Sequence, residues 1–517
     1  MSESALIEAF KNPAVYPHAI ERLEIITTHI SWVILTGTYA YKIKRPVKYS
    51  FVDYSSLENR KAYCEKEFAF NQSLASKVYK AVLPIRQTAN GPSLLGDGPI
   101  IDYALQMLEF PQDKLLSTVI KQNEITASMI DDIATQVAYF HQSAPVAALD
   151  TPYGTSERIL KPVKENFSEI RANLNDELAL QQLQHIETWA LATHAQLSPL
   201  MQARKQAGLT RACHGDLHLR NIVLIDQAPV IFDCIEFCET RRWLDPMAEI
   251  GFFTMDLMQH GRTDLAIRFL STYMETTGDY PGLQLLPFFM SYRALVRAKI
   301  QLYDRCLTTD APEQERFFKQ YQQYANFAES LIIKRQPILC VMHGVSGSGK
   351  STLAQEIILW HHAIRLRADV ERKRWFGHEP STLYSEQTTE KTYTHLLQTA
   401  AMLLKTGLSV VIDARFAKKN QRDQAAALAN ALGIPFKIIN CTASQTYLEQ
   451  GIVRRMHDKN NVSDATLAVL EKQLNTQETF TAEENAYTIT IPMDKWSPEE
   501  VKQTLTSAEF FGKIESI

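Results

Sequence analysis

The sequence predicts two folded parts of different classes: an α+β part with a strand-rich and a helix-rich lobe, followed by an α/β part with a parallel sheet. Three observations lead to this division. The 517 residues exceed what one hydrophobic core organises. Strand-like runs dominate the start of the chain, and long helical patterns then continue to residue 334. Beyond it, strand-like and helix-like segments alternate, which is typical of a parallel sheet.

The strand-rich lobe begins with two runs of β-branched and aromatic residues, 23–35 and 38–44. Gly37 stands between them, so the pattern predicts a β-hairpin. A charged helix is expected over 56–74 and a further strand over 99–109.

The helix-rich lobe is predicted from long helical patterns that a sharp loop and two short apolar runs interrupt. The expected elements are helices over 125–143, 156–208 and 245–334, the loop 212–221, and strands over 222–225 and 229–233.

The boundary between the two parts is expected near residues 334–337, because an amphipathic stretch ends there and Pro337 stops it. The predicted domains are therefore 1–334 and 335–517. After the boundary, a strand-like run leads into a glycine-rich loop and a helix. The strands expected in this part cover 338–342, 364–367, 409–412 and 436–440.

Composition excludes several classes of protein. The net charge of −4 argues against a general nucleic-acid or anionic-membrane binder. No apolar run approaches the ~20 residues of a membrane helix, and the start of the chain lacks the regions of a signal peptide. The seven cysteines are scattered without a zinc-type pattern, so free thiols in a reducing cytoplasm are expected. The oligomeric state stays open.

A phosphate-binding loop is predicted at GVSGSGKS, residues 344–351, which fits G-x-x-x-x-G-K-[ST]. Glycines let backbone amides approach phosphate oxygens, and the following helix adds the partial positive charge of its N-terminus. A Gly/Ser-rich linker is the alternative, but the flanking strand and helix are the context that the chemistry needs. ATP and Mg²⁺ are therefore expected. The predicted nucleotide-binding residues are Gly344, Val345, Ser346, Gly347, Ser348, Gly349, Lys350, Ser351 and Thr352, with Ser351 also on the metal.

Three further features of this part favour a kinase. Asp369 ends a strand-like run with Arg372 three residues on, so it could accept a proton from a substrate hydroxyl. Asp413 ends an apolar strand, where a carboxylate commonly holds Mg²⁺ through water. Arg454 and Arg455 precede the polar stretch MHDKNNVSD and could form a lid over the phosphoryl group. A helix-capping Asp, a strand-end Asp and solvated arginines are the ordinary alternatives.

Together these residues resemble the small-molecule and polynucleotide kinases of the P-loop class, such as gluconate kinase, chloramphenicol phosphotransferase and the kinase domain of phage polynucleotide kinase. The resemblance covers about residues 337–492 and places Arg422 at the position of a commonly retained Arg. It implies that Asp369 is a general base toward a bound hydroxyl, and it does not fix which hydroxyl.

A second phosphoryl-transfer motif is predicted at HGDLHLRN, residues 214–221, with Asp233 twelve residues beyond Asn221 at the end of an apolar strand. At this spacing Asp216 can accept a hydroxyl proton, while Asn221 and Asp233 can hold Mg²⁺. An Asx-rich turn is the alternative, which the three-part spacing disfavours. His218 is interpreted as structural.

Residues 20–330 resemble the aminoglycoside phosphotransferase and choline kinase superfamily, which shares the protein-kinase fold. The resemblance implies that Lys42, in YAYKI, binds the α- and β-phosphates and that Glu67 pairs with it. Lys44 lies on the same strand face and Glu65 on the same helix, so both alternatives stay open.

Two departures from protein kinases stand out: the phosphate-covering loop has one glycine, and Asp233 is followed by Cys-Ile rather than Phe-Gly. The aminoglycoside-kinase branch tolerates both. The motifs YAYKIKRPV, HGDLHLRN and GVSGSGKSTLA, in this order, resemble a bacterial two-domain arrangement of an aminoglycoside-phosphotransferase-like domain and a P-loop kinase domain.

The function predicted first is a bifunctional ATP-dependent phosphotransferase, in which each domain moves the γ-phosphoryl of Mg-ATP to a hydroxyl of a small molecule. A nucleotide-sensing regulator, with one domain as an ATP-binding switch, is the first alternative. A 5′-hydroxyl polynucleotide kinase activity of the C-terminal domain is the second, although the net acidic chain does not favour nucleic acid. Neither substrate follows from the sequence.

Overall fold

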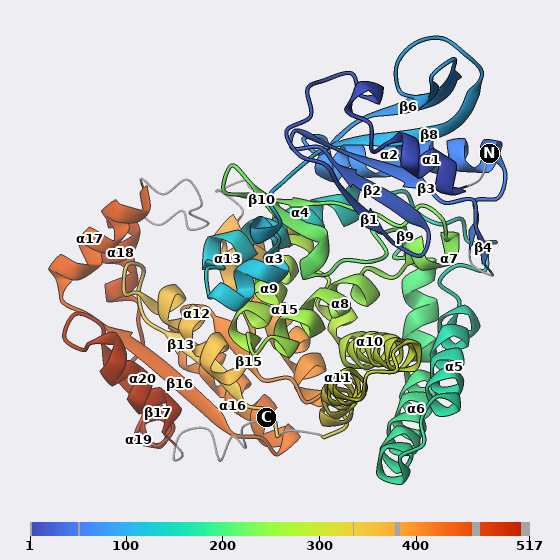
Figure 1. The fold of residues 1–517 in the computed structure, drawn as a ribbon. Coiled ribbons are helices and arrows are strands. Elements are labelled where there is room, and N and C mark those ends of the chain that lie inside the picture. Colours follow the sequence, from blue (N-terminus) through green and yellow to red (C-terminus); the bar gives the residue numbers. More distant parts are fainter. Residues whose placement is uncertain (1–2, 50–51, 334–335, 378–382, 457–465, 508–517) are drawn as a thin grey trace. The chain divides into compact units, whose positions relative to one another are not determined.

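The computed structural model describes residues 3–49, 52–333, 336–377, 383–456 and 466–507 (Figure 1). The chain divides into two compact units, each built from two segments. One unit contains residues 1–165 and 194–256, and the other contains residues 166–193 and 257–517. The predicted boundary near 334–337 stays a prediction, and its residues 334–335 lie outside the described part.

A six-stranded antiparallel sheet organises the first unit. Its strand order is β1-β2-β3-β8-β6-β7, and helix α2 (Leu57–Ala75) packs against β6 and β8. The Ser56 side chain caps α2 by accepting the backbone N–H of Asn59. The strands are β1 (Glu24–Thr27), β2 (Ser31–Leu35), β3 (Tyr39–Lys44), β6 (Tyr79–Thr88), β7 (Gly91–Ser93) and β8 (Ile100–Leu108).

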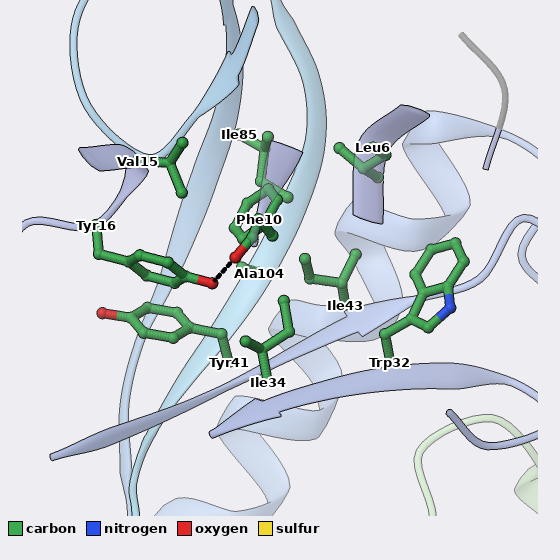
Figure 2. Packing of buried hydrophobic residues seen from close by; sticks show 10 residues of the cluster. All are labelled: Leu6, Phe10, Val15, Tyr16, Trp32, Ile34, Tyr41, Ile43, Ile85 and Ala104. Atoms are coloured by element: carbon green, nitrogen blue, oxygen red, sulfur yellow. Dashed lines mark hydrogen bonds between the residues drawn. The ribbon is translucent and has the colours of Figure 1, made fainter. Parts of the chain in front are cut away.

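The other face of this sheet carries an aromatic and aliphatic core (Figure 2). Tyr41 and Ile43 of β3 lie in that core with Phe10 and Tyr16, and the Tyr16 hydroxyl donates to the Phe10 carbonyl at 2.6 Å. Because side chains alternate along a strand, residue 42 of β3 points to the opposite face, toward α2. The sheet thus separates a hydrophobic core from a polar site.

The HGDLHLRN loop also lies in the first unit. The strands β10 (Ile222–Ile225) and β11 (Ala228–Ile231) form a two-stranded hairpin directly after it. Other elements that begin in the first unit are α1 (Glu3–Ala9), η1 (Pro13–Val15), β4 (Lys48–Tyr49), β5 (Val52–Asp53), η2 (Gln112–Lys114), α3 (Leu116–Val119), η3 (Ile120–Gln122), α4 (Ala127–Ser143), β9 (Arg211–Ala212), η4 (Leu219–Asn221), α7 (Glu239–Arg242), β12 (Trp243–Leu244) and α8 (Pro246–Gln259).

The second unit contains the predicted parallel sheet, which is confirmed. The strand order is β14-β15-β13-β16-β17, and all its pairs are parallel. Helix α9 (Thr263–Thr277) contacts the edge strand β14 and helix α12 (Lys350–His361). The strands are β13 (Leu339–His343), β14 (Ile364–Arg367), β15 (Val410–Asp413), β16 (Phe436–Thr442) and β17 (Thr488–Pro492).

Outside the two sheets and the elements named above, the described residues are mostly helical. The helices are α5 (Ser156–Ala172), α6 (Glu177–Gln206), η5 (Tyr280–Leu285), α10 (Leu286–Leu307), α11 (Ala311–Ser330), α13 (Ala368–Phe376), α15 (Glu386–Lys405), α16 (Lys419–Leu432), α17 (Gln445–Met456), α18 (Leu467–Asn475), α19 (Ala482–Asn485) and α20 (Pro498–Thr506). Within the described part of the chain, no helix combines the length and apolar character needed to cross a membrane.

Three of the predicted ranges are divided in the structure. The range 245–334 contains α8, α9, η5, α10 and α11 within its described residues. The run 23–35 is two strands, because the chain turns at residues 28–30, where the Thr28 amide and the Ser31 carbonyl bond at 2.9 Å. The run 156–208 is two helices, α5 and α6, separated at residues 173–176. Strands β6, β7 and β17 were not predicted; Pro84 interrupts the run of β6, and β7 is only three residues long.

Candidate active sites

Lys42 and Glu67 form the central ion pair of the site in the first unit. Lys42, on β3, places its Nζ 2.8 Å from Oε1 of Glu67, which lies on α2. The same Nζ lies 2.8 Å from Oδ1 of Asp233. Lys42 therefore joins the sheet, the helix and the predicted metal-binding carboxylate.

Lys44, the alternative phosphate-binding lysine, is enclosed in the protein. Its side chain is 1% exposed, against 17% for Lys42. Its Nζ contacts Glu67 Oε2 at 2.7 Å, the Tyr54 hydroxyl at 3.4 Å and Glu236. Lys42 is among the described residues that line the adjacent cavity, and Lys44 is not. The geometry favours Lys42 for contact with phosphate.

The helix partner of these lysines is Glu67 rather than Glu65. Glu65 is 57% exposed and lies 3.8 Å from Lys61 on the same helix. Burial alone would raise the pKa of Glu67, but the two lysines outweigh it and hold that pKa below its usual range. Glu67 is therefore a fixed negative charge shared by Lys42 and Lys44.

The loop 214–221 brings Asp216 and Asn221 together. Asn221 Nδ2 donates to the Asp216 carbonyl at 2.9 Å and to its Oδ2 at 3.3 Å. His218 Nε2 lies 3.2 Å from the same Oδ2. Its Nδ1 accepts the Arg220 amide at 3.1 Å, so Nε2 carries the hydrogen and donates to Asp216. The predicted base is thus oriented by two donors from its own loop.

Glu249 of α8 accepts backbone amides of this loop, and the sequence did not reveal it. Its Oε1 accepts the Gly215 amide at 2.5 Å, and its Oε2 accepts the His214 amide at 3.1 Å. His141 Nε2 lies 2.7 Å from the same Oε2. Burial opposes its ionisation, but His141 and the amides lower the pKa of Glu249.

Asp233 completes the site. Its backbone adopts a left-handed conformation, with φ of 66°, and its amide donates to the Tyr79 hydroxyl at 3.2 Å. Asp233, Asp216 and Lys42 line one cavity of about 490 Å³. Carboxylate and carboxamide oxygens are the ligands that Mg²⁺ prefers, so Asp233 and Asn221 fit that ion.

Glu109 is another residue that the sequence did not reveal. Its Oε2 accepts the backbone amides of Thr36 and Gly37, each at 2.7 Å. Arg22 Nε holds its other oxygen at 3.0 Å. The loop that carries the single glycine is therefore fixed by a carboxylate from the end of β8.

The glycines of the loop 344–349 have the conformations that the motif predicts. Gly344, Gly347 and Gly349 have φ of 139°, 85° and 81°. A Cβ on Gly347 would lie 2.3 Å from the Leu448 carbonyl oxygen, and one on Gly344 would lie 2.6 Å from that of Cys441. These positions need glycine for both conformation and space.

Polar atoms of this loop fit a phosphate group. The Ser346 amide donates to Oε1 of Gln473, on α18, at 2.7 Å. The Ser348 hydroxyl is buried and has no hydrogen-bond partner among the described residues. Lys350 Nζ lies 3.4 Å from the Val345 carbonyl at the start of the loop. A phosphate oxygen at this helix N-terminus would supply a partner for the Ser348 hydroxyl.

Two of the predicted nucleotide-binding residues offer little with their side chains. Val345 packs in a small core with Leu448, Ile452 and Leu470. Thr352 is exposed in the first turn of α12. Any contribution of Val345 to phosphate binding therefore comes from its backbone.

The predicted metal ligands of this unit lie together. Ser351 Oγ donates to Oδ1 of Asp413 at 3.1 Å, across α12 and the end of β15. Asp413 is 4% exposed, and its other oxygen lies 3.7 Å from Arg367 Nε. A hydroxyl and a carboxylate oxygen are suitable ligands for Mg²⁺.

Among the other predicted catalytic residues, the structure describes the side chains of Asp369, Arg372 and Arg454 but not that of Arg455. Asp369 lies in the first turn of α13 rather than at the end of β14, and its Oδ1 accepts Arg372 Nη1 at 3.1 Å. Arg454 is exposed, with its Nε 3.4 Å from the Gln450 carbonyl. Arg455 lies in α17, but its side chain is outside the described residues, as are residues 457–464 of the predicted lid MHDKNNVSD.

The chain is similar over most of its length to uncharacterized proteins of Mycobacterium tuberculosis and Mycobacterium bovis. Each is 28% identical over 462 residues, which cover 86% of this chain and 88% of the relative.

Solved structures resemble single parts of the chain. A choline/ethanolamine kinase family protein from Mesorhizobium loti is 13% identical, covers 63% of this chain and 98% of its own, and has a TM-score of 0.38. A gluconokinase from Sinorhizobium meliloti is 20% identical, covers 33% of this chain and 91% of its own, and has a TM-score of 0.26.

Family matches agree with the two sites. Residues 51–286, which contain Glu67, Asp216 and Asp233, match the phosphotransferase enzyme family. Residues 339–480, which contain the glycine-rich loop, match an AAA domain. The chain is therefore a kinase that joins a domain of the phosphotransferase enzyme family to a P-loop AAA domain.

Proposed function

We propose that this kinase is bifunctional: each domain transfers the γ-phosphoryl group of ATP to a hydroxyl of a small molecule in the cytoplasm. The observation that carries the proposal is the convergence of Lys42, Asp216 and Asp233 on one cavity. Asn221 orients Asp216 within that arrangement. A domain that only sensed nucleotide would need the lysine but would have no use for an oriented base.

In the first site, Asp216 accepts the proton of the substrate hydroxyl, while His218 and Asn221 fix its carboxylate. Lys42 binds the phosphates and Glu67 keeps its ammonium in place. Mg²⁺ would neutralise phosphate charge, and Asn221 and Asp233 are the residues that would hold it.

In the second site, the amides of the glycine-rich loop and Lys350 bind the phosphates. Ser351 and Asp413 would hold Mg²⁺. Asp369 accepts the hydroxyl proton, and Arg372 orients it through their 3.1 Å contact. Arg454 and Arg455 neutralise charge on the transferred group.

The test is a comparison of full-length wild type, Asp216→Asn and Lys350→Ala, each incubated with a cell metabolite extract and γ-labelled ATP. The expected result is one labelled species lost only in Asp216→Asn and another lost only in Lys350→Ala. Loss of both species in either single variant would contradict two independent transferases.

Further measurements separate the alternatives. No labelled metabolite, with nucleotide binding retained and biological activity unchanged in Asp216→Asn and Asp369→Asn, is the result that a nucleotide-sensing regulator predicts. Labelling of a 5′-hydroxyl oligonucleotide that disappears in Lys350→Ala is the result that a polynucleotide kinase predicts.

A further inference from the structure

Two arginines of the edge strand β14 converge on one carboxylate of helix α9. Arg365 Nη2 lies 2.7 Å from Glu275 Oε1, and Arg367 Nη1 lies 3.0 Å from Glu275 Oε2. The arginines are two residues apart on a strand, so they share one face. Glu275 is 13% exposed, and each of its oxygens holds one guanidinium.

The same two arginines reach the predicted metal ligands. Arg365 Nη1 donates to the Ser351 carbonyl at 3.3 Å. Arg367 Nε lies 3.7 Å from Asp413 Oδ2, and Asp413 Oδ1 accepts the Ser351 hydroxyl at 3.1 Å. An uninterrupted set of polar contacts therefore runs from Glu275 to the Ser351–Asp413 pair.

This arrangement affects how Asp413 can bind a cation. A guanidinium is permanently positive, so an Arg367 paired fully with Asp413 would compete with Mg²⁺ for that carboxylate. Arg367 Nη1 donates a hydrogen bond to Glu275 Oε2 at 3.0 Å, whereas Arg367 Nε lies 3.7 Å from Asp413 Oδ2. The stronger partner thus draws the guanidinium away from the metal ligand.

We propose that Glu275 is a positioning residue for the P-loop site, which holds Arg365 and Arg367 so that Asp413 remains available to Mg²⁺. The inference rests on the proposed roles of Ser351 and Asp413 as metal ligands. Glu275 lies within residues 51–286, the segment that matches the phosphotransferase enzyme family. The P-loop site therefore depends on a residue from outside its own family match.

The test measures ADP binding to the full-length chain by titration calorimetry, in EDTA and over a series of Mg²⁺ concentrations. A Lys42→Met background removes the contribution of the other site. Loss of the remaining binding in Lys42→Met/Lys350→Ala assigns the signal to the P-loop. If that signal has no Mg²⁺ dependence, the proposed metal ligands fail, independently of Glu275.

In this background, Glu275→Gln is expected to raise the Mg²⁺ concentration for half-maximal binding at least tenfold. ADP affinity in EDTA should change less than twofold. Adding Arg367→Gln removes the competing cation and should return the Mg²⁺ requirement to within threefold of the background. Asp264→Asn is the matched control, because Asp264 pairs with Arg262 at the opposite end of α9.

An unchanged Mg²⁺ requirement in a folded Glu275→Gln protein would overturn the proposal. So would a double variant that needs as much Mg²⁺ as Glu275→Gln, because a purely structural ion pair predicts no rescue. If Glu275→Gln does not fold, Arg367→Gln alone decides: the proposal predicts an equal or lower Mg²⁺ requirement, and a tenfold higher one would refute it.

Discussion

The second unit should lose stability in mild acid because of His343, the residue before Gly344. His343 is 1% exposed, and its Nδ1 donates to Asn440 Oδ1 at 2.8 Å. Burial, together with the positive charges of Arg422, Arg415 and Lys350, lowers the pKa of His343 to about 4. Its Nε2 has no partner among the described residues.

The sign and size of the effect follow from linkage. The unfolded chain binds a proton on this histidine below about pH 6.5, whereas the folded protein does so only near pH 4. Stability is therefore lost as the pH falls through this window. A shift from 6.5 to about 4 removes about 2 kcal/mol of unfolding free energy between pH 7 and pH 5.

Native-state hydrogen exchange, read by mass spectrometry on peptides of β13 and β16 and corrected for intrinsic rates, measures this loss locally. His343→Gln should reduce the loss by about 2 kcal/mol relative to wild type. His361→Gln is the variant matched to His343→Gln, because burial also lowers the pKa of His361 to about 4. An identical acid loss in wild type and His343→Gln would refute the reasoning.

Three other substitutions test different parts of the structure. Arg422→Met should cost about 3–5 kcal/mol in urea unfolding, because it leaves buried Glu484 without the guanidinium 2.5 Å away. Gly347→Ala should lower ADP affinity at least tenfold, because its Cβ would clash with the Leu448 carbonyl. Gly433→Ala is the control, because Gly433 also has a positive φ but has open space around it. It should leave ADP affinity unchanged and cost only about 1–2 kcal/mol of stability. Lys44→Met should cost about 3–5 kcal/mol of stability by leaving Glu236 buried without its lysine, a loss that equal unfolding curves for wild type and variant would disprove.

Residues fixed by local spacing were predictable from the sequence. The glycines at 344–349 and the loop 214–221 each combine several constrained positions within a few residues, so chance matches are few. The alternation of strands and helices likewise predicted the parallel sheet. In each case the signal and the structure depend on neighbours in sequence.

Residues that act from distant elements were not predictable. Glu249, Glu109, Gln473 and Glu275 reach their sites only through tertiary packing, and no motif surrounds them. The ambiguity between residues 42 and 44 has the same origin. Strand period alone gives both the same face, and only the burial beside Tyr54 separates them.

The hydrogen bond from the Ser346 amide to Gln473 has a consequence for ligand exchange. A phosphate oxygen that binds this amide takes the place of a carboxamide oxygen carried by α18. The affinity for nucleotide is then a difference between two bound arrangements, in which every 1.4 kcal/mol of the α18 contact changes the dissociation constant about tenfold. The packing of Leu470 against Val345 adds to that contact. Substitutions of Gln473 or Leu470 on α18 can therefore change nucleotide affinity without altering the sequence of the phosphate-binding loop.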